Sequence, residues 1–132
     1  MGSALTLADY LRAEAARPFE RGRADCITFG ADWVRLRLGF DAMAPWRGYS
    51  TDAEANDLMA GWGGIVRVVG RGMRRAGIPL TRDPQPGDVG MIAIAGLALG
   101  AIKTERGWVT RLDDGLASLP PERVRVLAAW SV

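Results

Sequence analysis

The sequence contains no histidine and only one cysteine, Cys26, among its 132 residues. A single thiol cannot form an internal disulfide, so nothing in the chain requires an oxidising compartment. The usual zinc sites combine several cysteine and histidine ligands, and this composition excludes them. We therefore expect no metal and no other cofactor.

Long apolar runs and an excess of charge of one sign are also missing. No apolar stretch approaches the roughly 20 residues that span a bilayer, and no basic segment followed by an apolar one suggests a signal peptide. Residues 1–66 carry 7 basic and 9 acidic side chains, and residues 67–132 carry 10 and 6, for a net charge of +2. This asymmetry is mild. We therefore expect no membrane partner and no nucleic-acid partner.

The first half of the chain predicts four helices. Thr6 is placed to cap a helix that ends before Pro18, and Asp25 is placed to cap a second one that runs to about Leu38 and is closed by Gly39. Two more follow, from about residue 51 to 60 and from about 65 to 76. The third stops before Gly61-Trp62-Gly63-Gly64, and the fourth is ended by Gly77 and Pro79.

The helix that begins after Asp25 has a wide apolar stripe with a period of 3.6 residues. The stripe contains Cys26, Ile27, Phe29, Gly30, Trp33, Val34 and Leu38. Thr28, Asp32 and Arg35 fall on the opposite side, which we expect to face solvent.

From Gly87 the pattern changes to short apolar runs between glycine and proline turns, which is typical of an antiparallel meander. The runs are 89–95, 97–104, 108–112, 116–119 and 124–130. Helices followed by strands predict an α+β fold with a five-stranded antiparallel sheet. We expect one domain over residues 1–132, with a helical part at about 5–77 and a sheet part at about 87–131.

Cys26 is the residue best placed for nucleophilic chemistry, because a helix N-terminus with nearby arginines lowers the pKa of a thiol. The same cysteine lies on the apolar stripe, and free cysteines often serve as small core residues. The pattern alone leaves both interpretations open.

Two motifs carry a resemblance to a known family. Gly22-Arg23-Ala24-Asp25-Cys26 opens a helix, and Pro86-Gly87-Asp88-Val89 opens the sheet. Together they resemble the NlpC-type cell-wall peptidases, small papain-like cysteine peptidases that cleave peptidoglycan stem peptides. The whole chain also resembles a family of short proteins of unknown function encoded beside phage and prophage tail genes, through the opening Pro-Phe-x-x-Gly-x-x-Asp-Cys at 18–26. The resemblance covers most of residues 5–130 and implies a papain-like fold with Cys26 at the nucleophile position.

The chain departs from the peptidase pattern where the histidine would fall, near Ala98. Cleaving an amide needs a base to form the thiolate and an acid to protonate the leaving amine. The carboxylates of Asp25 and Asp88, with a reference pKa of about 4, are poor acids at neutral pH, and Lys103 holds its proton tightly. We therefore expect no self-sufficient peptidase.

The expected function is a non-catalytic NlpC-like scaffold, acting as a structural or assembly component of the tail of a phage, prophage or gene-transfer agent. Its expected partners are other tail or tail-tip proteins, with peptidoglycan as a further candidate. It would be present in the bacterial cytoplasm before assembly and in the particle afterwards. Trp46, Tyr49 and Trp62 are the predicted contact residues, because aromatic side chains anchor interfaces. The alternative is a cell-wall cysteine endopeptidase that uses Cys26 with a base from a partner or a carboxylate.

Two clusters of charged residues have a structural interpretation that is favoured over a functional one. Arg67, Arg71, Arg74 and Arg75 lie largely on one face of the fourth predicted helix. They suggest an anionic or nucleic-acid patch, but without interleaved aromatic residues a solvated helix face is favoured. Asp113 and Asp114 fit a hairpin turn better than a cation site.

Overall fold

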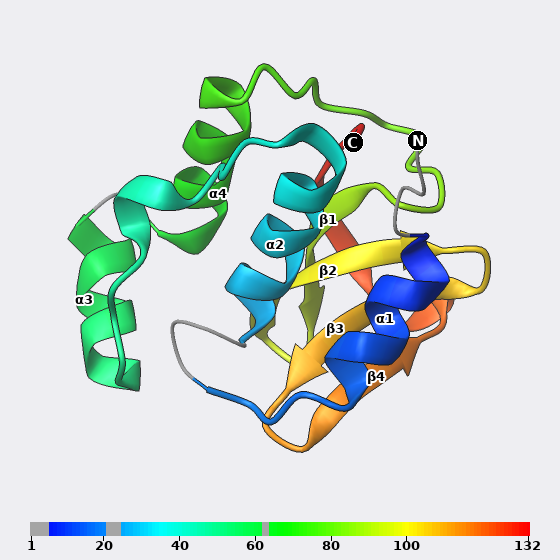
Figure 1. Ribbon diagram of the computed structural model, residues 1–132, viewed down its shortest axis with the longest axis horizontal. Helices are drawn as coiled ribbons and strands as arrows, with labels where there is room; N and C mark the ends of the chain where they lie inside the picture. Colours follow the sequence, from blue (N-terminus) through cyan, green and yellow to red (C-terminus); the bar gives the residue numbers. More distant parts are fainter. Residues whose placement is uncertain (1–5, 21–24, 62–63) are drawn as a thin grey trace.

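The computed structural model describes residues 6–20, 25–61 and 64–132. Within them the chain forms helices first and strands afterwards (Figure 1). The helices are α1 (Leu7–Ala15), α2 (Cys26–Leu38), η1 (Ala44–Trp46), α3 (Asp52–Gly61), α4 (Ile65–Arg75) and η2 (Pro121–Arg123). The strands are β1 (Val89–Ile94), β2 (Leu97–Thr104), β3 (Gly107–Leu112), β4 (Gly115–Leu119) and β5 (Arg125–Trp130). The predicted α+β class with a five-stranded antiparallel sheet is confirmed.

The sheet has the strand order β4-β3-β2-β1-β5. The prediction of a simple meander therefore holds for β1 to β4 only, because β5 crosses back and pairs with β1. Pro120 and Pro121 follow β4 directly, and a proline has no N–H to donate to a neighbouring strand. The turn of η2 then leads the chain to the other edge of the sheet, and β5 becomes an edge strand.

The predicted caps of α1 and α2 are present. Thr6 Oγ1 accepts the Asp9 N–H at 3.1 Å, and Asp25 caps α2. Gly39 ends α2 in the left-handed conformation, with φ of 73°, which glycine adopts at little cost. These local signals explain why the helix limits follow from the sequence.

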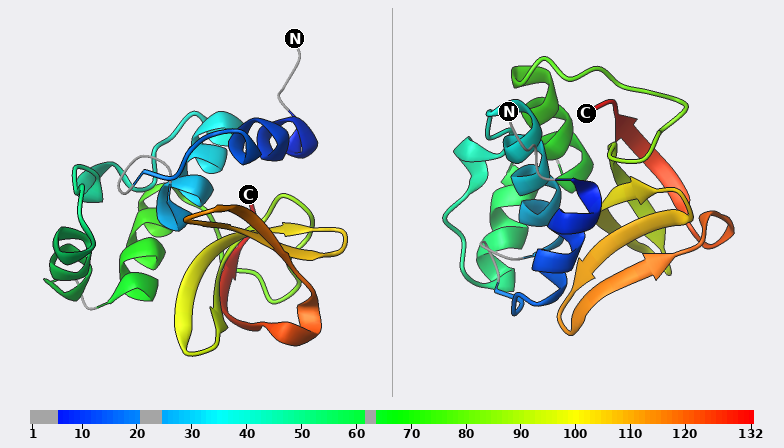
Figure 2. Two further views of the ribbon diagram at one scale, coloured as in Figure 1. Left: turned by 90° about the horizontal axis from the view of Figure 1, so that it is seen from below. Right: turned by 45° about the vertical axis from the view of Figure 1, so that its right-hand side comes forward.

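Helix α2 is central, because it contacts β1, β2 and β3 (Figure 2). Phe29, Trp33 and Val34 on its inner face are almost fully buried against Met91 and Ile102 of the sheet. Trp33 Nε1 also donates a hydrogen bond to the carbonyl oxygen of residue 87 at 2.7 Å, where β1 begins. The middle of α2 and the start of β1 are thereby fixed to each other.

The predicted exposure pattern of α2 is wrong at its two ends. Thr28 is buried, with 1% of its surface exposed, because its hydroxyl accepts the Asp25 N–H at 2.9 Å. Leu38 was assigned to the apolar stripe but is 50% exposed, since α2 has passed the edge of the core there. The interior of the stripe is buried as predicted.

A buried arginine ties α1 to the sheet. Arg111 of β3 is 1% exposed and donates hydrogen bonds to the carbonyl oxygens of Glu14 and Arg17. These carbonyls lie at the C-terminal end of α1, where a cation is favoured by the helix dipole. No helix in the described part of the chain is long and apolar enough to cross a membrane.

Candidate functional site

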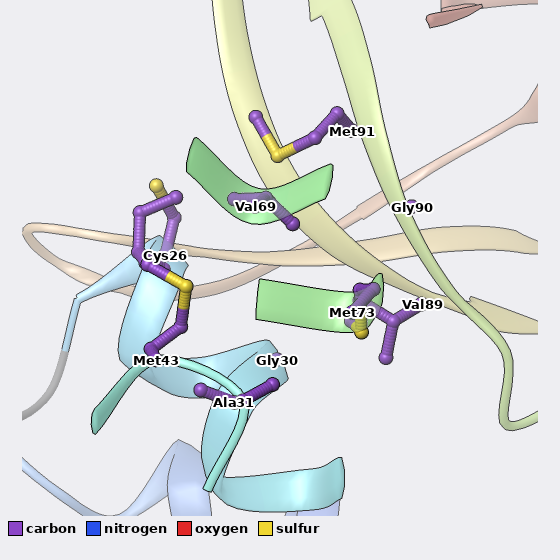
Figure 3. Close-up of a pocket in the computed structure, with 12 residues that line it drawn as sticks. Cys26, Gly30, Ala31, Met43, Val69, Met73, Val89, Gly90 and Met91 are labelled. Carbon is purple, nitrogen blue, oxygen red and sulfur yellow. The ribbon is translucent and has the colours of Figure 1, made fainter. Parts of the chain in front are cut away.

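Cys26 is the first residue of α2 and is partly exposed. It borders a small inner cavity of about 20 Å³, roughly the space of one water molecule. Figure 3 shows that this cavity lies between α2, α4 and β1, with Met43, Met73 and Met91 around it. Its lining is almost entirely apolar.

On its other side Cys26 borders an outer groove of about 290 Å³. The start of α2, the segment from Tyr49 into α3 and the first residues of β2 form its walls. Ala98 lies in this groove together with Cys26. Ala98, near which the resemblance places the peptidase histidine, therefore lines the same groove as the thiol and carries a methyl group.

The start of α2 is placed directly on β2. A Cβ atom at Gly100 would lie 2.5 Å from the carbonyl oxygen of Cys26, which is closer than atoms can approach. Only glycine allows this contact between the strand and the helix N-terminus. The position of Cys26 over the sheet thus depends on a residue in β2.

Asp25 is fully buried and its two carboxylate oxygens have separate structural tasks. Oδ1 accepts the backbone N–H groups of Ile27 at 3.0 Å and Thr28 at 2.9 Å. Oδ2 accepts the hydroxyl of Tyr49 at 2.7 Å. These bonds cap α2 and attach the loop before α3 to it, so Asp25 holds the helix start that carries Cys26.

Asp88 lies away from Cys26. Its Oδ2 accepts the Gln85 N–H at 2.8 Å and its Oδ1 accepts the Val132 N–H at 3.0 Å. Asp88 directly follows residue 87, whose carbonyl oxygen accepts the hydrogen bond from Trp33. Trp33 lies two turns along α2 from Cys26. The structure therefore brings Asp25 next to the thiol position, while Asp88 fixes the turn into β1 and the last residue of the chain.

Asp52 is a groove residue that the sequence analysis did not identify. Asp52 is the first residue of α3 and lines the outer groove. Among the described residues that line this groove, Cys26, Tyr49 and Asp52 have ionisable side chains. Its sequence context is that of an ordinary first-turn residue of a helix. No local signal indicates that α3 starts beside α2.

The expectation that Trp46 and Tyr49 are exposed contact residues is wrong. Trp46 is 2% exposed and packs in the main core, and Tyr49 is 7% exposed because its hydroxyl is bonded to Asp25. Neither offers an accessible ring to a partner. Trp62 lies outside the residues that the structure describes.

Among residues 6–20, 25–61 and 64–132, no group of three or more aspartate, glutamate or cysteine side chains is arranged to hold an ion. Asp113 and Asp114 form the two-residue turn between β3 and β4, with Leu112 paired to Gly115.

Comparison with known families identifies one match. A family model described as a domain of unknown function, DUF6950, matches residues 3–132, which is almost the whole chain. The chain belongs to the DUF6950 family. Neither a curated protein nor a solved structure matches it.

The four arginines of α4 in the DUF6950 domain line two neighbouring hollows of the surface. Arg67, Arg71 and Arg74 line a groove of about 580 Å³ beside residues 77–80. Arg75 instead lies over two aromatic rings, 5.4 Å from the centre of Phe40 and 5.9 Å from that of Trp46. Arg75 is thus engaged by aromatic side chains, and Arg71 and Arg74 border both this groove and a second hollow that Arg75 lines with Pro45 and Trp46.

Proposed function

We propose that this DUF6950 domain is a non-catalytic scaffold with an NlpC-like, papain-like fold, and that it serves as a structural or assembly component of a phage-type tail. The observation that carries the proposal is the outer groove, which is lined by Cys26 and by Ala98. Its nucleophile position is occupied, and the position expected for a histidine holds alanine in a chain without any histidine.

The remaining groups of the groove are poorly suited to replace an imidazole. Amide cleavage needs one group that takes a proton and returns it near pH 7. Tyrosine and aspartate have reference pKa values of about 10 and about 4, on either side of that range. Losing general acid–base help typically costs about 10²- to 10⁴-fold in rate. Tyr49 is in addition hydrogen-bonded to Asp25.

The assignment to a tail is supported by the resemblance of the segment 18–26 to the proteins encoded beside tail genes. The proposed partners are other tail or tail-tip proteins, with peptidoglycan as a further candidate. The domain would be made in the bacterial cytoplasm and then incorporated into the particle.

The second candidate is a cell-wall cysteine endopeptidase. Its support is the partly exposed Cys26 at a helix N-terminus in an open groove, which is the usual setting of a reactive thiol. Asp52 is then the carboxylate placed in the same groove, and a partner chain would have to supply any imidazole.

A cleavage assay separates the two candidates. Purified protein is incubated with peptidoglycan sacculi and with synthetic stem peptides, and released fragments are measured by liquid chromatography and mass spectrometry. We expect no release above that of the Cys26→Ala variant. Turnover that disappears in Cys26→Ala and persists in Asp88→Asn would overturn the proposal, because Asp88 lies outside the groove.

A genetic assay tests the tail assignment. In the phage or prophage that encodes the protein, deletion of the gene is expected to prevent the formation of intact tails visible by electron microscopy. Complementation with Cys26→Ala is expected to restore them, since a scaffold does not need the thiol. Normal tails after deletion would contradict the proposal.

A further inference from the structure

A second groove lies between α4, the segment that follows it and the end of β5. In Figure 1 this segment runs from the end of α4 across to β1. One wall of the groove carries Arg67, Arg71 and Arg74, and the opposite wall carries Pro79 and Leu80. The groove has a volume of about 580 Å³. One wall is therefore cationic and the other is apolar.

The apolar wall is held by backbone hydrogen bonds. Leu80 forms an isolated antiparallel bridge with Trp130 at the end of β5. Two bonds of 2.9 Å flank that bridge, from Thr81 N to the Ala129 oxygen and from Ser131 N to the Pro79 oxygen. Gly70 of α4 lies over the Trp130 ring, and a Cβ atom there would be in ordinary van der Waals contact with it at 3.9 Å. The groove is thus part of the ordered fold.

The arginines of the cationic wall are spaced at i, i+4 and i+7, which places them on one helix face. All three are exposed, and no acidic residue lines the groove. Among the described residues, no carboxylate lies within ion-pair distance of Arg67 or Arg74. Arg47, by contrast, is paired with two aspartates, at 2.8 Å and 2.7 Å. Arg67 and Arg74 are therefore available to pair with an anionic ligand.

We propose that this groove binds an acidic peptide segment of a partner protein. Glutamate or aspartate side chains of the segment would pair with the arginines, whose planar guanidinium groups match carboxylates well. An apolar side chain of the segment would cover Leu80, which is 70% exposed. This proposal concerns a surface separate from the Cys26 groove and does not depend on the proposed function.

The same features fit a nucleic acid less well. The net charge of the whole chain is only +2, and single-stranded nucleic acids are usually bound by accessible aromatic rings on which bases stack. The tryptophan of this groove, Trp130, is 3% exposed. The wall of Pro79 and Leu80 would face a phosphate backbone without a matching group.

The test measures binding of a fluorescein-labelled ten-residue peptide of alternating glutamate and leucine to the full chain, by fluorescence anisotropy at low salt. We expect binding that weakens as salt is added. Each of Arg67→Ala, Arg71→Ala and Arg74→Ala should weaken it by about two- to fivefold, and the triple Arg→Glu variant should abolish it. Leu80→Asn should weaken it as well. Arg35→Ala, which removes an exposed arginine of α2 away from the groove, should leave it unchanged.

Control peptides of the same length test which side chains of the probe the groove recognises. Peptides with lysine in place of glutamate, or serine in place of leucine, should bind at least tenfold more weakly. The proposal is overturned by undetectable binding of the glutamate–leucine peptide at 1 mM, or by an equal effect of Arg35→Ala and Arg71→Ala. It is also overturned if a 15-nucleotide single-stranded DNA binds more tightly than the peptide. Circular dichroism of each variant confirms folding, and all the substituted side chains are exposed.

Discussion

Removing the Asp25 side chain tests whether this carboxylate is a structural element of the α2 start. Asp25→Ala eliminates the N-cap of α2, which typically costs about 0.5–2 kcal/mol. It also leaves the buried hydroxyl of Tyr49 without its 2.7 Å acceptor, which adds about 1–3 kcal/mol. The expected loss in the free energy of unfolding is therefore about 1.5–5 kcal/mol.

Two milder variants divide this loss into its parts. Asp25→Asn keeps an acceptor for the N–H groups of α2 and should cost about 1 kcal/mol. Tyr49→Phe removes the hydroxyl that bonds to Asp25 and keeps the aromatic ring. In a double-mutant cycle, Asp25→Asn and Tyr49→Phe should show a coupling energy of about 1 kcal/mol, because the two residues are in direct contact.

Urea denaturation followed by tryptophan fluorescence gives these values, with the slope m checked for each variant. Thr6→Ala is the matched control, since Thr6 caps α1 at an exposed site. It should cost about 1 kcal/mol. If Asp25→Ala costs no more than Thr6→Ala, the buried network is not stabilising. A direct role of Asp25 in chemistry at Cys26 would then have to be reconsidered.

Two further predictions concern α4 and α1. Gly72→Ala should destabilise the fold by about 1–3 kcal/mol, because its Cβ would lie 2.3 Å from the carbonyl oxygen of Ala42. Gly70→Ala, two residues earlier in the same helix, should stabilise it by about 0.5–1 kcal/mol through higher helix propensity. Similar melting temperatures for both variants would contradict this. Burial raises the pKa of Tyr10, whose hydroxyl donates to the Phe29 oxygen. The contribution of Tyr10 to the free energy of unfolding should therefore be constant below about pH 10, the reference pKa of tyrosine. Above that pH it should fall by about 1.4 kcal/mol per pH unit, because the tyrosine ionises first in the unfolded state. Urea midpoints between pH 8 and 11 measure this slope, and an equal slope in Tyr10→Phe would refute its assignment.

The limits of helices and strands followed closely from the sequence because their signals are local. Thr6, Asp25 and Gly39 act through bonds to residues within about one helical turn. The strand predicted at 97–104 has the same limits in the structure, since glycine turns bound it on both sides. Such signals depend on the immediate neighbours of a residue and require no knowledge of the tertiary fold.

The failures concern contacts between distant parts of the chain. Tyr49 is buried by a bond to a residue 24 positions away, and Arg111 by a bond to the carbonyl of Glu14, 97 positions away. Hydrophobic patterning treats an arginine or a tyrosine as a surface residue unless its partner is known. The pairing of β5 with β1 was missed for the same reason. Proximity in sequence favours pairing with β4.

The candidate site was predictable only in part. Cys26 and Asp25 are neighbours in the sequence, so a helix N-cap places them together wherever the helix lies. The proximity of Cys26 and Ala98 was inferred from a family resemblance, and the two do line one groove. Asp52 was not anticipated, because its place in that groove depends on how α3 is connected to α2.

The arrangement around Cys26 can be explained without a reaction. Asp25 caps α2 and holds Tyr49, and Gly100 lets the start of α2 rest on β2. Each of these contacts stabilises the fold irrespective of the thiol. The same contacts would position a nucleophile in an active peptidase. The geometry of Cys26 alone therefore does not distinguish a scaffold from a peptidase. The distinguishing feature is a proton-transferring partner such as an imidazole, and the position of Ala98 carries none.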